Sequence, residues 1–256
     1  MYREGTGDRS RVGVLVLHGY GGSPCSMQEY AVWLADAGYT VALPLLTGHG
    51  STPEDMETAR WSDWTRDADA AFAWLTQRTD KVFVTGLSMG GTLALWIAEH
   101  HAEVAGLITV NAALRFRQEP IMLFLGSLGH PRWLKAIGND ICEPGQDEHA
   151  YPRLPVRSMR QLALLLRDVR RDLGAIECPA LVFSSVTDHV VPPANQRALY
   201  AGLRTGDKAF VQLTRSYHCA TLDYDKERIF AGALEFISAH AQCGAKCADQ
   251  AYSAHR

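Results

Sequence analysis

Long hydrophobic runs are the first feature that the sequence lacks. Its longest apolar stretches, such as Ile121–Leu125, are far shorter than the roughly 20 residues that cross a bilayer, so no integral membrane segment is expected. The first eleven residues are polar and charged and lack the apolar stretch of a secretory signal, which predicts a cytoplasmic protein. A formal net charge of −3 gives no indication of nucleic acid or an anionic membrane as a partner.

Paired cysteines and cofactor motifs are also missing. The sequence has six cysteines, none of them in a C-x-x-C pair: Cys25, Cys142, Cys178, Cys219, Cys243 and Cys247. A large hydrophobic core needs no disulfides, so free thiols are expected. The sequence has no Walker A motif, no H-E-x-x-H and no G-x-G-x-x-G after a strand, so we expect neither a metal nor a cofactor. The run Glu99-His100-His101-Ala102-Glu103 is interpreted as the solvated polar end of a helix.

What the sequence does contain is an alternation of short apolar runs with amphipathic segments. Its 256 residues, 47% of them hydrophobic, suit one large α/β domain. The apolar runs predict buried strands at Val12–Leu17, Thr40–Leu43, Val82–Thr85, Val104–Val110, Ala180–Ser184 and Ala209–Leu213. Helical periodicity predicts helices at Ser26–Ala37, Trp61–Arg78, Met89–His101, Arg157–Leu173, Ala194–Leu203 and Lys226–His240. This order predicts a mostly parallel sheet flanked by helices on both faces.

The alternation stops between residues 112 and 156. A long segment without core strands is usually functional, and we interpret it as a small cap inserted into the sheet domain. The core is then expected in two parts, 1–111 and 157–241, followed by a disordered tail at 242–256. An apolar cluster in the insertion suits an acyl chain: Ile121, Leu123, Phe124, Leu125, Leu128 and Trp133.

The strongest local motif is Gly86-Leu87-Ser88-Met89-Gly90. It follows a predicted strand and precedes a predicted helix, which is the setting that a nucleophile elbow requires. Glycines flank the serine because Cβ atoms would clash in so tight a turn. This position predicts Ser88 as a nucleophile at the carboxyl end of a strand.

A serine nucleophile needs a base and an acid that orients the base. When the chain order is serine, acid, histidine, the base must follow the strand at 180–184. His218 lies in a loop after the last predicted strand, whereas His240 and His255 lie at the final helix end and in the tail. Asp188 follows the strand at 180–184 and is the candidate acid, because the earlier position after the strand at 104–110 holds Asn111.

The oxyanion of an acyl-transfer reaction needs two backbone N–H donors. Met89 supplies one because it directly follows Ser88, and Tyr20, in the glycine-rich loop after the first strand, is the best candidate for the other. His18 is expected to shape that loop through hydrogen bonds. His49, between Gly48 and Gly50, and His189, beside Asp188, are both interpreted as structural.

Five motifs together resemble the bacterial carboxylesterases and monoacylglycerol lipases of the α/β-hydrolase superfamily: Leu17–Pro24, Gly48–Gly50, Gly86–Gly91, Asp188–Pro193 and Ser216–Asp223. The resemblance covers about Val12 to His240, and it implies an α/β-hydrolase fold with Ser88, Asp188 and His218 as the triad. It also implies Tyr20 and Met89 as oxyanion donors. The position of Tyr20 is more often Phe in that family, a change that leaves a backbone donor intact. By position in the insertion, Ile137 and Glu148 would line a small polar end for glycerol.

The expected function is hydrolysis of a lipophilic carboxylic ester, such as a monoacylglycerol, through an acyl-enzyme. A short-chain carboxylesterase or a thioesterase is the alternative, and C–C bond hydrolysis also remains open. A non-catalytic ligand-binding protein on the same fold is the contrasting hypothesis. The expected partner is a small ester, with transient membrane contact by the cap, in a monomer or homodimer.

Overall fold

A seven-stranded sheet forms the centre of the computed structural model, which describes residues 1–242. The predicted tail with Cys243 and Cys247 therefore lies outside the described residues. The order of strands across the sheet is β1-β3-β2-β4-β5-β8-β9. The strands span Tyr2–Arg3 (β1), Val12–Leu17 (β2), Thr40–Ala42 (β3), Lys81–Leu87 (β4), Val104–Val110 (β5), Ala180–Ser185 (β8) and Lys208–Leu213 (β9).

All neighbouring strands are parallel except β1, which pairs antiparallel with β3 at one edge. The prediction of a mostly parallel sheet is confirmed, and its six strands agree with the structure to within two residues at each end. Strand β1 was not predicted, because a strand of two exposed residues carries no apolar run. Parallel pairing brings the carboxyl ends of β4, β8 and β9 to one edge, where the loops that follow them can meet.

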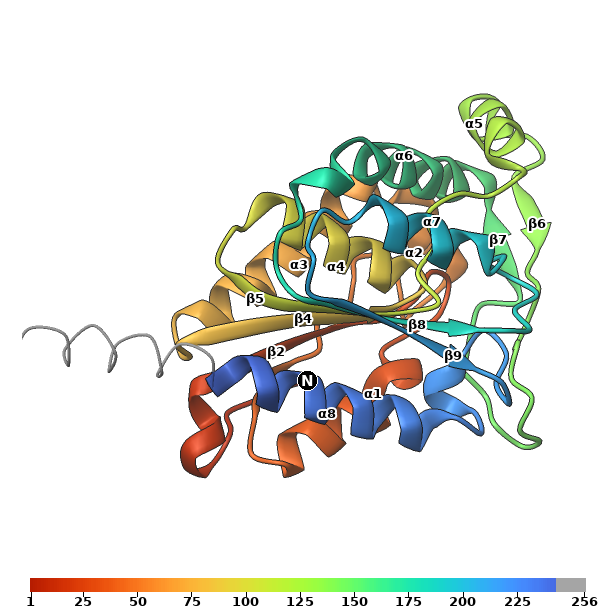
Figure 1. Ribbon diagram of the computed structural model, residues 1–256. Helices are drawn as coiled ribbons and strands as arrows, with labels where there is room; N and C mark the ends of the chain where they lie inside the picture. The colour runs from red at the N-terminus through yellow and green to blue at the C-terminus, as the bar shows by residue number, and fades with distance from the viewer. Residues whose placement is uncertain (243–256) are drawn as a thin grey trace, which may run out of the picture.

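Helices cover both faces of the sheet (Figure 1). The helices span Cys25–Asp36 (α1), Pro53–Thr58 (α2), Trp61–Thr76 (α3), Met89–His100 (α4), Glu119–Leu128 (α5), Val156–Asp172 (α6), Ala194–Gly202 (α7) and Lys226–Ala241 (α8). Side chains of α1 and α8 form one apolar core with the sheet, and those of α3, α4, α6 and α7 form the other. The amphipathic pattern of the predicted helices thus marks the face that each one buries.

The insertion, residues 112–156, contains regular elements that the sequence analysis did not predict. Helix α5 lies in it, together with a separate two-stranded antiparallel sheet of β6 (Trp133–Lys135) and β7 (Arg153–Pro155). Helix α5 was missed because it is apolar on nearly every side and contains Gly126, so it has no clear polar face. Figure 1 shows α5, β6 and β7 beyond the end of the sheet at which β8 terminates.

None of the helices in residues 1–242 combines the length and the apolar character needed to cross a bilayer. The expectation of no spanning segment agrees with this finding for the described part of the chain. Helix α6, which follows the insertion, packs against both α4 of the core and α5 of the insertion. The insertion is therefore attached to the core through a helix that belongs to both.

Candidate active site

Ser88 lies in a strained turn between β4 and α4. Its backbone has φ 57° and ψ −120°, a conformation that costs a non-glycine residue free energy. The turn closes only because its neighbours lack side chains: a Cβ on Gly86 would overlap the backbone of Gly90, and a Cβ on Gly90 would overlap the carbonyl oxygen of Leu17. The predicted nucleophile elbow has the geometry that its motif requires.

The backbone around Ser88 is fixed by hydrogen bonds from several elements. Its N–H donates to the carbonyl oxygen of Val110 at the end of β5, at 3.0 Å. Its carbonyl oxygen accepts from the N–H groups of Thr92 and Ala113, at 3.2 and 3.1 Å. The side chain therefore stands at the start of α4, where the helix dipole favours negative charge, and it is held there by the core and the first residues after β5.

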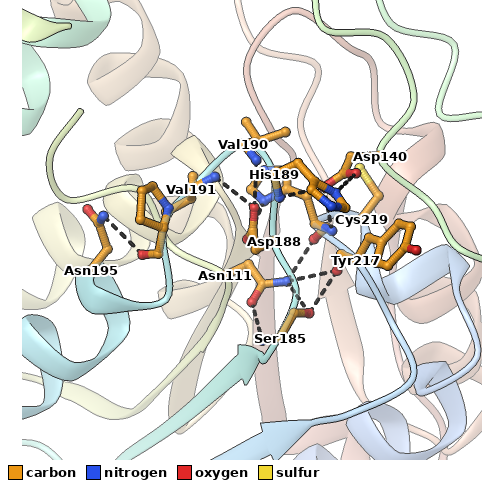
Figure 2. A network of polar contacts seen from close by, with 12 residues as sticks. Asn111, Asp140, Ser185, Asp188, His189, Val190, Val191, Asn195, Tyr217 and Cys219 are labelled. Carbon is orange, nitrogen blue, oxygen red and sulfur yellow. Dashed lines mark hydrogen bonds and ion pairs between the residues drawn. The ribbon is translucent and has the colours of Figure 1, made fainter. Parts of the chain in front are cut away.

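His218 and Asp188 lie on the loops after β9 and β8 and are in direct contact. The Nδ1 atom of His218 lies 2.8 Å from Oδ2 of Asp188, and both side chains are almost fully buried. The other oxygen of Asp188 accepts the N–H groups of Val190 and Val191, at 2.9 and 2.7 Å (Figure 2). His218 and Ser88 line the same pocket. The structure thus brings together the three residues predicted as nucleophile, acid and base.

His18 shapes the loop that carries Tyr20. It is fully buried, and burial lowers its pKa from 6.5 to about 3, so the imidazole is neutral. Its Nε2 accepts the N–H of Leu46 at 3.2 Å, which leaves the proton on Nδ1 to be donated to the carbonyl oxygen of Gly19 at 2.9 Å. The histidine therefore ties the Tyr20 loop to the segment after β3 through both ring nitrogens.

The two residues predicted to supply the oxyanion donors lie at the pocket. Tyr20 and Met89 both line it with Ser88, and neither backbone N–H has a protein acceptor among residues 1–242. The Tyr20 hydroxyl points elsewhere and donates to Oγ of Ser158 in α6 at 2.6 Å, since that hydroxyl itself donates to Pro155. The hydroxyl of Tyr20 is thus engaged with Ser158, and the backbone N–H of Tyr20 is left available to an oxyanion.

His49 is buried beside this loop but away from the pocket lining. Burial lowers its pKa from 6.5 to about 4, and its ring packs edge-on against those of Tyr20 and Trp64. Its Nδ1 lies 3.2 Å from the carbonyl oxygen of Thr47. These contacts give His49 the structural role that the sequence analysis assigned to it.

The pocket above Ser88 has a volume of about 100 Å³ and is mainly apolar. The insertion supplies much of its lining, including Ile137 and Glu148, which the resemblance placed at its polar end. The expected acyl-binding cluster is wrong in its position, because none of its six residues lines the pocket. Ile121, Phe124 and Leu128 instead face outward on α5. The apolar lining includes Leu87, Met89, Phe116, Leu154, Leu162 and Val190.

Glu148 is the one carboxylate in the lining. Its Oε2 accepts a hydrogen bond from the thiol of Cys219, the residue after His218, at 2.9 Å. Burial raises the pKa of Glu148 above its ordinary value, against the opposing effect of the thiol hydrogen bond. Burial also raises the pKa of Cys219, and the negative charge of Glu148 adds to that shift. The pair adds polar groups, besides Ser88 and His218, to a mainly apolar pocket.

Asn111 and Asp140 contact the His218 loop and were missed as functional candidates. Asn111 donates from Nδ2 to the carbonyl oxygen of His218 at 2.8 Å, and its Oδ1 accepts the N–H of Ser185 (Figure 2). Its φ of 46° could not be anticipated, although Asn tolerates that region better than most residues. Asp140 comes from the insertion, in a segment without any catalytic motif, so no local signal marks it.

Among residues 1–242 there is no cluster of three or more His, Cys, Asp or Glu side chains suited to a metal ion. The interpretation of residues 99–103 as a solvated helix end is wrong for Glu99. That side chain is half-buried, with its Oε1 atom out of contact with solvent, and burial, together with the charges of Asp172 and Asp168, raises its pKa from 4.5 to about 9. The four cysteines of this range are free thiols, as expected.

Known proteins similar to this chain include ester hydrolases. The family described as serine aminopeptidase, S33, matches residues 8–225. The chain is 45% identical over 233 residues to the thermostable monoacylglycerol lipase of Bacillus sp. (strain H-257), covering 90% of this chain and 92% of that protein. It is 25% identical over 226 residues to the carboxylesterase of Bacillus subtilis (strain 168), covering 88% of this chain and 91% of that one.

Solved structures give the same result. A structure reported for the metagenome-derived lipolytic enzymes LipS and LipT superposes with a TM-score of 0.89 at 44% identity, covering 94% of this chain and 97% of that one. The monoglyceride lipase of Saccharomyces cerevisiae shares the fold, with a TM-score of 0.77 at 15% identity, over 94% of this chain and 90% of that one. The chain belongs to the serine aminopeptidase S33 family of α/β-hydrolases and is a carboxylic ester hydrolase.

Proposed function

We propose that Ser88 is the nucleophile of this hydrolase, with His218 as its base and Asp188 as the orienting acid. The carrying observation is that Ser88 and His218 line one pocket while Asp188 contacts Nδ1 of the imidazole from behind. Nε2 of His218 is then free to take the hydroxyl proton of Ser88 as the oxygen attacks the ester carbonyl. Asp188 holds the required tautomer and stabilises the imidazolium that forms.

The backbone N–H groups of Tyr20 and Met89 then stabilise the oxyanion of the tetrahedral intermediate. Both are free of protein acceptors among the described residues and lie at the pocket, which supports this role. Loss of one such donor typically costs about 3–4 kcal/mol in the transition state. The alcohol leaves with the proton from His218, and water hydrolyses the acyl-enzyme by the same steps in reverse.

The proposed substrates are monoacylglycerols or similar lipophilic esters. The 45% identity to a thermostable monoacylglycerol lipase and the apolar lining of the pocket both support this assignment. Ile137 and Glu148 would form the polar end that accepts the alcohol. The carboxyl oxygens of Glu148 can accept hydrogen bonds from the hydroxyl groups of such an alcohol, and burial raises the pKa of this group above its ordinary value.

A short-chain carboxylesterase or a thioesterase is the second candidate, and the pocket volume favours it. Sites for drug-sized ligands typically have volumes of roughly 300–1,000 Å³, and the pocket above Ser88, at about 100 Å³, is smaller. A long acyl chain would need the insertion to open further. We therefore propose that residues 112–156 act as a cap over Ser88.

The cap would also provide transient contact with a lipid surface. Helix α5 exposes Ile121, Phe124 and Leu128 at helical spacing, so they share one face, and an exposed apolar helix face favours an interface between water and lipid. We further propose a cytoplasmic protein that works as a monomer or homodimer on a small ester.

The experiment that decides among these substrates is a chain-length series. Values of kcat/KM are measured for glycerol monoesters and for ethyl esters with acyl chains of two to eighteen carbons. A monoacylglycerol lipase gives a maximum at medium or long chains and prefers glycerol to ethanol as the leaving alcohol. A maximum at acetate or butyrate, without preference for glycerol, would establish the short-chain esterase instead. Turnover in Ser88→Ala is the background for every substrate.

A further inference from the structure

A carboxylate from the insertion contacts both loops that carry the proposed acid and base. Asp140 is buried, with 7% of its surface exposed. Its Oδ2 accepts the backbone N–H of His218 at 3.1 Å and that of His189 at 3.1 Å. Its Oδ1 lies 2.7 Å from Nδ1 of His189, and its carbonyl oxygen accepts the N–H of Cys219 at 3.1 Å. Figure 2 shows Asp140 beside His189 and Cys219.

These contacts fix the two loops relative to each other. The His218 loop follows β9 and the loop of Asp188 and His189 follows β8, so each leaves a different strand. One oxygen atom of Asp140 bridges a backbone N–H from each loop. A shift of either loop would stretch a bond to that oxygen. Hydrogen bonds to an ionised acceptor are about twice as strong as those between neutral groups, so this bridge resists such a shift.

A second buried carboxylate anchors the same part of the insertion. Asp223, from the core, accepts the N–H groups of Cys142 and Glu143, at 2.7 and 3.0 Å. It also accepts the N–H of Tyr217 at 2.9 Å. Residues 140–143 are thus joined to the His218 loop from both directions, which keeps Asp140 in its place against that loop.

We propose that Asp140 is a positioning residue for His218, so that the insertion takes part in catalysis as well as covering the pocket. The inference rests on the proposed function of His218 as the base. Asp140 does not line the pocket. It acts through the backbone of His218, whose imidazole must stay aligned with both Ser88 and Asp188. A misplacement of about 1 Å in such a group can lower the rate of reaction about 100-fold.

The test is the variant Asp140→Asn, which keeps the shape of the side chain but removes the charge and replaces one oxygen by an NH₂ donor. We expect kcat to fall about 10- to 100-fold, and KM to change less than about threefold. The fall should be the same for p-nitrophenyl acetate and for a long-chain ester. The rate at which a fluorophosphonate labels Ser88 should fall in parallel, because that reaction also needs His218.

Active-site titration with the fluorophosphonate expresses every rate per folded, competent molecule, and so separates positioning from unfolding. Asp225→Asn is the matched control, because Asp225 is a comparably buried carboxylate that accepts the backbone N–H of Arg215, earlier in the same loop. Its kcat should stay within about twofold of wild type. Should Asp140→Asn not fold, Asp140→Glu retains the charge while displacing it, and kcat should again fall for both substrates.

Two results would overturn the inference. An unchanged kcat and labelling rate in Asp140→Asn would show that His218 does not depend on the carboxylate. A loss confined to the long-chain ester would show that Asp140 acts only on substrate entry through the insertion. Failure of the proposed function is a different result, because wild-type protein would then show no Ser88-dependent labelling or hydrolysis at all.

Discussion

Ser88 and His218 lie in the same pocket but are held in different ways. Ser88 is positioned by β4, β5 and α4, through backbone hydrogen bonds and through contacts that only glycine permits. The backbone of His218 is held by side chains from distant parts of the chain, Asn111 after β5 and Asp140 in the insertion. The proposed nucleophile is therefore held by backbone contacts within the core of the sheet, whereas the backbone of the proposed base is held by side chains from distant segments.

The largest expected effect is at Asp188, which contacts the imidazole of His218. Asp188→Asn removes the charge behind His218 and favours the wrong tautomer, because the amide NH₂ would donate to Nδ1. We expect kcat for p-nitrophenyl acetate to fall about 10³- to 10⁴-fold, with little change in KM. Steady-state kinetics measure this, with a thermal melt as a control for folding. A loss under about tenfold would mean that another group orients His218.

The second prediction concerns Gly90, in the turn that holds Ser88. In Gly90→Ala the new Cβ overlaps the carbonyl oxygen of Leu17, which is backbone and cannot move aside. We expect destabilisation of about 3 kcal/mol or more, measured by urea unfolding, and loss of activity in the folded fraction. Gly174→Ala is the control, because a Cβ there meets open space at an ordinary φ. Equal stability of the two variants would contradict a nucleophile turn held by close backbone contact.

The third prediction separates stability from catalysis at the far end of α4. Glu99 has a folded-state pKa of about 9, whereas the unfolded group titrates near 4.5. Between these values the folded state holds a proton that the unfolded chain has lost, so stability falls as pH rises. The Tm of Glu99→Gln should therefore fall less between pH 5 and pH 8.5 than the Tm of wild type. The two falls should differ by about 2–4 °C or more.

Differential scanning calorimetry at both pH values measures this effect, and Glu235→Gln, an exposed carboxylate, is the control. The kcat of Glu99→Gln should match that of wild type, because Glu99 lies at the opposite end of α4 from Ser88. Parallel pH curves for wild type and Glu99→Gln would rule out a raised pKa at this position.

The smallest effect is expected at Tyr20. Tyr20→Phe removes the hydroxyl that donates to Ser158 but keeps the backbone N–H proposed as an oxyanion donor. We expect a loss of about 1 kcal/mol in stability and a change in kcat of less than about threefold. Chemical denaturation and steady-state kinetics give the two values. A large fall in kcat with unchanged stability would mean that the hydroxyl itself takes part in the reaction.

The same comparison explains what could be predicted from the sequence. The elbow motif at Ser88 spans five residues, an apolar run precedes it and helical periodicity follows it, so its strand, its helix and its strained turn could all be predicted. His218 and Asp188 could be found because chain order and the position after a strand limited the choice. Asp140 and Asn111 could not, because their role comes from contacts with residues 78 and 107 positions away from them in the chain.

The insertion was the least predictable region for the same reason. Its six clustered apolar residues were expected at the acyl site, yet Phe116 and Leu154 line the pocket and the outer face of α5 carries Ile121, Phe124 and Leu128. Hydrophobicity alone does not say which side of a helix faces a pocket when nearly every residue is apolar. The error at Glu99 was the opposite one. A charged residue at a helix end is usually exposed to solvent, so exposure was expected, but this side chain is partly buried.

The central claim is that Ser88 forms the covalent intermediate, and the most direct test is to locate the adduct. Wild-type protein is incubated with a fluorophosphonate, digested and analysed by mass spectrometry, alongside Ser88→Ala and an assay of p-nitrophenyl ester hydrolysis. We expect one adduct per molecule, on the peptide that contains Ser88, with no adduct and no hydrolysis above background in Ser88→Ala. An adduct on another residue, or full hydrolysis by Ser88→Ala, would contradict this claim.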